Sequence, residues 1–141
     1  MLLNIFIGSA IMVLCLMFQI VLIIATFRYY VGHRNLTDHN SPWKDLRLLS
    51  IVMLLLILGN LGQIAIWGLV FQLLGEFQQF SLAFYHSAVN FASLGYGDIV
   101  MSDRHKLLGA LEALNGVLMI GVSTAALMGP FKDALKKAGV Q

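Results

Sequence analysis

Three long apolar runs constrain the fold of this chain more than any other feature of its sequence. Residues 3–27 and 48–75 carry no charge, and residues 107–127 carry only Glu112. A membrane-spanning helix needs about 20 predominantly apolar residues, so each run is long enough to cross a bilayer. Of the 141 residues 59% are hydrophobic and 11% are charged, whereas soluble domains carry about 25% charged residues. The sequence therefore predicts an all-α integral membrane protein with three transmembrane helices.

A fourth apolar segment, residues 80–92, is too short to span a bilayer, since as a helix it would be about 20 Å long. It is followed by the run Ser93-Leu94-Gly95-Tyr96-Gly97-Asp98. Only glycine takes positive φ without a steric penalty, so Gly95 and Gly97 let neighbouring carbonyls point to one side. Backbone that does not span the membrane is tolerated there where it is buried in protein or lines water. The pattern predicts a re-entrant helix followed by a loop that lines a pore.

The run at residues 93–98 resembles the threonine-valine-glycine-tyrosine-glycine-aspartate filter of the potassium channel pore-domain superfamily. Residues 48–131 are similar to its two-helix pore module, as found in small bacterial ion channels. The resemblance implies a fourfold-symmetric homotetramer, because each chain supplies one strand of the carbonyl rings that replace the water around K⁺. The ion would bind the carbonyls of Ser93, Leu94, Gly95 and Tyr96 and the hydroxyl of Ser93. The Leu94 and Tyr96 side chains are expected to pack against the re-entrant helix.

The sequence departs from the common family pattern in four places. Serine replaces threonine at residue 93, leucine replaces a β-branched residue at 94, and methionine stands at 101 where proline is frequent. Tyr85-His86 replaces an aromatic pair, and this change bears on filter stability. We expect four residues to support the filter: Tyr85, His86, Glu112 and Asn115.

A buried carboxylate inside a membrane is costly and usually functional, which singles out Glu112. One hypothesis is that Glu112 and His86 form a hydrogen-bonded brace behind the filter, so that charging of His86 would couple conductance to pH. The alternative is that Glu112 faces water at the outer vestibule and His86 is a satisfied buried ring. The sequence leaves both open.

The third run carries the residues expected to gate the pore. Gly116 or Gly121 resembles the family's hinge glycine, although close helix packing explains them equally well. Gly129-Pro130 is expected to end or kink the helix, with Met128 or Phe131 at the intracellular constriction and Ser123 and Thr124 beside the water-filled cavity. In the second run, Asn60, Gln63 and Trp67 share one helix face and predict hydrogen bonds to another span.

Basic residues predict the orientation. Seven of them lie in residues 28–47 or after residue 131, and two lie between the second and third runs. The positive-inside rule therefore places the first loop and the C-terminus in the cytoplasm, and the N-terminus and filter mouth outside the cell membrane. The expected organisation is an extra transmembrane helix (1–30), a basic cytoplasmic loop (31–47), the pore module (48–131) and a short tail (132–141). The basic loop either only sets the topology or also binds anionic lipid headgroups.

The first run has one alternative interpretation, a cleaved signal peptide. It lacks a basic n-region, however, and is longer than the usual 7–15 apolar residues.

These features together predict a potassium-selective channel that conducts passively. The alternatives are a weakly selective cation channel on the same scaffold and a non-conducting accessory membrane protein. The sequence holds no nucleotide-binding loop, Cys/His cluster or nucleophile constellation, so neither enzyme activity nor an organic cofactor is expected. Cys15 is the only cysteine, which excludes an intrachain disulfide, and a net charge of +2 gives no argument for nucleic acid.

Overall fold

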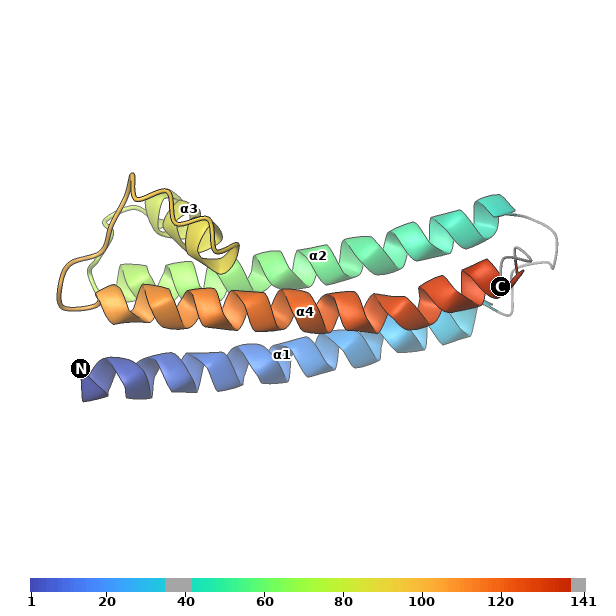
Figure 1. Ribbon diagram of the computed structural model, residues 1–141, viewed down its shortest axis with the longest axis horizontal. Coiled ribbons are helices and arrows are strands. Elements are labelled where there is room, and N and C mark those ends of the chain that lie inside the picture. Colours follow the sequence, from blue (N-terminus) through green and yellow to red (C-terminus); the bar gives the residue numbers. More distant parts are fainter. Residues whose placement is uncertain (35–41, 138–141) are drawn as a thin grey trace.

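The computed structural model describes residues 1–34 and 42–137, and this part of the chain contains four helices and no strand. In chain order they are α1 (Leu2–Arg34), α2 (Pro42–Leu73), α3 (Phe80–Phe91) and α4 (Lys106–Lys137) (Figure 1). Three of them, α1, α2 and α4, are long and apolar enough to cross a membrane. The all-α prediction with three spanning helices and a short fourth helix is thereby confirmed.

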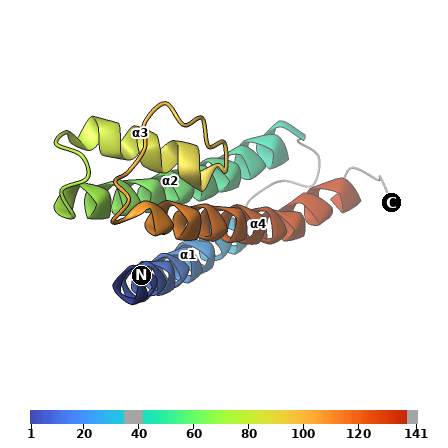
Figure 2. The same ribbon diagram turned by 60° about the vertical axis from the view of Figure 1, so that its left-hand side comes forward.

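The three long helices lie side by side, and α3 packs on α2 and α4 near one end (Figure 1). Helix α1 lies on the other side of the α2–α4 pair and makes no contact with α3 within the described residues (Figure 2). The N-terminus lies at the same end as α3, and the end of α4 lies at the opposite end. The extra helix therefore stands outside the module formed by the other three.

The buried face of α1 is largely polar or small. It consists of residues spaced by three or four positions or multiples of them, namely Asn4, Gly8, Cys15, Gln19, Thr26 and Tyr30. Large apolar side chains lie on the other faces, with Phe6 75% and Met17 64% exposed. Lipid tails are as apolar as leucine, so helices in a membrane gain most from burying small and polar groups against one another. The burial pattern of α1 is that of a membrane helix.

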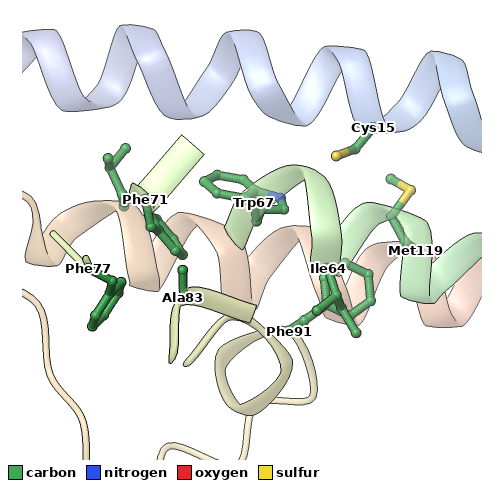
Figure 3. Close-up of a cluster of buried hydrophobic side chains, with 9 residues drawn as sticks. Cys15, Ile64, Trp67, Phe71, Phe77, Ala83, Phe91 and Met119 are labelled. Atoms are coloured by element: carbon green, nitrogen blue, oxygen red, sulfur yellow. The ribbon is translucent and has the colours of Figure 1, made fainter. Parts of the chain in front are cut away.

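A cluster of buried aromatic and aliphatic side chains fixes the position of α3 (Figure 3). Trp67 and Phe71 of α2 are fully buried, and Ala83 and Phe91 of α3 pack in the same cluster. Leu108 and Met119 complete it from α4. Helix α3 is therefore held against both α2 and α4 by buried side chains.

Glycines allow the backbone of α3 to approach its neighbours closely. A Cβ on Gly68 of α2 would lie 3.1 Å from the Phe84 Cα, and one on Gly116 of α4 would collide with the Phe91 carbonyl oxygen. Helices in membranes use small residues for such contacts. Gly116 is thus explained by packing, the second of the two explanations that the sequence left open.

Gly129-Pro130 does not end α4, which was one of the two outcomes expected, because the helix continues through Pro130 to Lys137. Proline inside a helix removes one hydrogen bond and costs about 3 kcal/mol or more, so packing must compensate. Pro130 is buried, and the last turns are tied to the other helices: Tyr30 donates to Asp133 (3.2 Å) and Lys137 to Asp45 (3.1 Å). Residues 132–137 therefore belong to α4. Of the expected basic loop (31–47), residues 31–34 belong to α1 and residues 42–47 to α2, and residues 35–41 and 138–141 lie outside the described residues.

Candidate functional site

The backbone after α3 alternates in the sign of φ. Ser93, Gly95 and Gly97 have φ of 57°, 56° and 73°, and Leu94 and Tyr96 between them are not among the residues with positive φ. In an ordinary extended strand successive residues face opposite sides. Reversal of φ at every second residue turns the successive carbonyls toward one side. The sequence indicated this for the two glycines, whereas the positive φ of Ser93 was not foreseen.

The carbonyl oxygens of residues 93–97 accept no hydrogen bond from the residues that the structure describes. Hydrogen bonds from the Ser93 and Leu94 N–H groups to Asn90 (2.8 Å) and Val89 (2.9 Å) tie the start of the loop to α3. No described residue donates to the carbonyls that follow, and residues 92–98 are exposed. Backbone carbonyls are almost always paired in folded proteins, so this row is available to a partner outside the chain.

The side chains of Leu94 and Tyr96 are 54% and 64% exposed. More than half of each side chain is therefore uncovered within one chain, and the expected packing against α3 stays a prediction. Both point to space that a neighbouring molecule can fill.

Tyr85 and His86 of α3 bond to Asp98 and Ile99, the residues at the end of the loop. The Tyr85 hydroxyl donates to the Asp98 carboxylate (2.8 Å), and His86 Nδ1 lies 3.0 Å from the Ile99 carbonyl oxygen. A carbonyl only accepts, so Nδ1 carries the proton, and Nε2 accepts from Asn90 Nδ2 at 2.9 Å. Burial lowers the pKa of His86, against the opposing effects of the Ile99 carbonyl and of the Asp98 and Glu76 charges. The geometry is that of a neutral, satisfied ring.

A second brace closes the outer end of the module. Glu76, in the turn after α2, accepts from the Ser102 N–H (2.7 Å) and hydroxyl (2.6 Å), and its other close partner is His105 Nδ1 (2.5 Å). Burial alone would raise the pKa of Glu76, but the hydrogen bonds from Ser102 and His105 outweigh it and bring the pKa below its usual value. The brace links the end of α2 to the start of α4 across the loop.

Glu112 is fully buried between the helices, so it does not face a vestibule. Its hydrogen-bond partner is the Ser87 hydroxyl of α3 and not His86. Both placements of Glu112 offered by the sequence are therefore wrong, whereas the satisfied ring expected for His86 in the second interpretation agrees with its hydrogen bonds to Ile99 and Asn90. Asn115, also fully buried, has no hydrogen-bond partner for its amide among the described residues.

Ser123 does not face a cavity, which corrects its expected role. It is buried, accepts from Gln19 Nε2 of α1 (2.7 Å) and lies 3.3 Å from Asn60 Oδ1 of α2. Gln63 of α2 donates to Gln19 Oε1 (2.6 Å). Asn60 and Gln63 of the second run thus bond to other helices, as expected, whereas the buried Trp67 Nε1 has no hydrogen-bond partner among the described residues. Thr124 next to Ser123 is exposed.

The other residues expected to gate the pore, Gly121, Met128 and Phe131, are partly uncovered when one chain is considered by itself. A Cβ on Gly121 would meet nothing within 4 Å, in contrast to Gly116. Met128 and Phe131 are each 46% exposed. The surroundings of Gly121 are therefore open, and nearly half of each of the two larger side chains is exposed within one chain.

Sequence reasoning missed the support given by Ser87, Asn90 and the Glu76–Ser102–His105 brace. Glu76 and His105 are 29 residues apart, and no helical or strand period links such positions. Ser87 and Asn90 are two of several polar residues in the short helix, with Ser81, Tyr85 and His86, so the sequence did not single them out. Among the described residues, no group of three or more His, Cys, Asp or Glu side chains could hold a metal ion.

The three spanning helices, the re-entrant helix and the loop with one-sided carbonyls define a membrane protein of the pore-loop class. A family model described as an ion channel matches residues 61–131. The match covers half of the chain and extends from α2 to α4, and the chain belongs to this ion channel family, in agreement with the resemblance to potassium channel pore domains. Neither a curated protein nor a solved structure matched the chain.

Proposed function

We propose that this protein is a potassium-selective channel in which four copies of the chain surround one pore. The observation that carries the proposal is the row of unpaired carbonyls at residues 93–97, set by alternating φ. Rings of such carbonyls replace the hydration shell of K⁺. The ion would bind at Ser93, Leu94, Gly95 and Tyr96, and Asp98 would lie at the outer mouth. Transport would be passive, with no enzyme chemistry and no organic cofactor.

The proposed orientation in the cell membrane is N-terminus and filter outside, C-terminus in the cytoplasm. Two observations support it: the N-terminal end of α1 lies at the same end as the loop (Figure 1), and most basic residues lie near the other end. Arg28 and Arg47 are exposed near the cytoplasmic end. Contacts of such residues with anionic headgroups would contribute about 1 kcal/mol each.

The exposed side of α4 is the proposed lining below the filter. Thr124 would face the cavity, and Met128 or Phe131 would form a constriction that closes by dewetting. Gly121 is the preferred hinge of the two glycines, because its surroundings are open whereas Gly116 is packed against Phe91.

Flux of K⁺ and Na⁺ into liposomes that hold the purified protein tests the proposal. We expect K⁺ flux that Na⁺ does not replace, and loss of this flux in Gly95→Ala, because alanine at φ of 56° is strained. Gly32→Ala is the matched control, since a Cβ there meets nothing within 4 Å and its φ is not positive. Equal flux of both ions would indicate the weakly selective channel, and absence of flux under all conditions the accessory protein.

A further inference from the structure

The environment of Glu112 contains no counter-charge. The side chain is fully buried, and no described Lys, Arg or His forms an ion pair with it. Near it, α1 contributes the buried thiol of Cys15, and α3 contributes Ser87 and Asn90; Ser87 in turn bonds to the Ile64 carbonyl of α2. The nearest histidine, His86, is engaged with Ile99 and Asn90. A buried carboxylate without a partner costs several kcal/mol, so this environment favours the neutral acid.

The two contacts of the Ser87 hydroxyl bear on the protonation state of Glu112. Its hydroxyl oxygen is 2.8 Å from the Ile64 carbonyl oxygen of α2 and is also bonded to Glu112 Oε1. A hydroxyl has one hydrogen to donate, and a carbonyl and an ionised carboxylate only accept. One hydrogen cannot serve both acceptors. If it goes to Ile64, the contact between Ser87 and Glu112 requires a proton on Glu112.

We propose that Glu112 is a protonated, neutral carboxylic acid in the folded protein at neutral pH. Its O–H donates to Ser87, and Ser87 donates to the Ile64 carbonyl. This chain of two hydrogen bonds runs from α4 through α3 to α2 and makes Glu112 a positioning residue for the helix that precedes the loop. It also means that Glu112 adds no negative charge beside the pore. The proposal holds whichever ion the channel conducts.

Infrared spectroscopy of the purified protein in liposomes at pH 7 tests the proposal directly. The chain contains two glutamates, Glu76 and Glu112, so isotope-labelled glutamate reports on these two alone. We expect a labelled carbonyl band of a protonated acid in the wild type, its loss in Glu112→Gln, and its retention in the matched control Glu76→Gln. Glu76 is the ionised one of the pair, since its hydrogen bonds lower its pKa.

A wild type that shows only ionised carboxylate bands overturns the proposal, and so does an acid band that survives in Glu112→Gln. If Glu112→Gln does not fold, labelled Glu76→Gln contains Glu112 as its only labelled residue and gives the same answer. Ser87→Ala tests the direction of the hydrogen bond. We expect the acid band to remain but to shift to higher frequency, because the O–H loses its acceptor, and an unshifted band would contradict the assignment to Ser87.

Discussion

Single residues in and around the loop have two roles: some adopt the positive φ that shapes the backbone, and others hydrogen-bond to the loop and keep it in place. Ser93 shows the limit of the first group, because it takes positive φ without being glycine. Such a conformation costs of order 1–3 kcal/mol for a non-glycine residue and persists only where the surroundings enforce it. Here the hydrogen bonds to Asn90 and Val89 at the end of α3 enforce it.

The brace of Glu76 leads to a prediction about pH. The pKa of Glu76 is lowered in the folded protein, so ionised Glu76 contributes stability that is present above the unfolded pKa, about 4.3, and is lost as the pH falls through the folded pKa. We expect Glu76→Gln to lower the thermal unfolding midpoint at pH 7, and the difference from the wild type to shrink below pH 4. Unfolding followed by circular dichroism at several pH values measures it. A difference that stays constant with pH would rule out the ionised brace.

At the scale of helices, the contact of α3 with α4 depends on Gly116. A methyl group there would collide with the Phe91 carbonyl, and overpacking of this kind costs about 1–3 kcal/mol. We expect Gly116→Ala to be destabilised by that amount and to lose flux, because α3 carries the loop. Gly121→Ala is the matched control on the same helix. It should be as stable as the wild type or more stable by about 0.5–1 kcal/mol, the usual gain from alanine in a helix. Equal stability of the two variants would contradict the packing role of Gly116.

Helix α1, which the family match does not include, is bonded to the module through Gln19. Its amide joins Gln63 of α2 to Ser123 of α4. Gln19→Leu removes both bonds and leaves buried polar groups unpaired, so we expect a loss of about 1–2 kcal/mol in the free energy of unfolding. Ile20→Leu, at a half-exposed neighbouring position (48%), is the control. If Gln19→Leu and Ile20→Leu have the same free energy of unfolding, the hydrogen bonds of Gln19 do not stabilise the packing of α1.

At the scale of the whole molecule, a single chain leaves apolar side chains of the loop and of α4 exposed. Leu94 and Tyr96 beside the loop and Leu114, Val117 and Leu118 on α4 are each at least half exposed. Four copies around an axis would cover these side chains and bring the carbonyl rows together. We expect native mass spectrometry from detergent to give four times the chain mass of 15.6 kDa. A conducting protein that is a monomer or dimer would contradict the proposed assembly.

The sequence by itself determined the class of fold and the place of the loop, because both depend on local properties. Lengths of apolar runs specify spanning helices regardless of their partners, and glycines at residues 95 and 97 specify a backbone with positive φ. The same local reasoning identified Glu112 as a residue of interest and foresaw that Asn60 and Gln63 bond to another helix, whereas Tyr85 was identified through the resemblance to a known family.

Only the tertiary structure decided which polar group meets which. Glu112 bonds to Ser87 rather than to His86, Ser123 bonds to α1 rather than facing a cavity, and α4 continues through Pro130. These outcomes depend on the rotation and depth of each helix against the others, over separations as large as the 104 residues between Gln19 and Ser123. Each spanning helix carries apolar residues on all of its faces, so the alternation of apolar and polar residues does not mark which face is buried. In a membrane the buried face of a helix is determined by contacts of small and polar residues with other helices. Each such contact joins two distant segments, so it cannot be found from one segment alone.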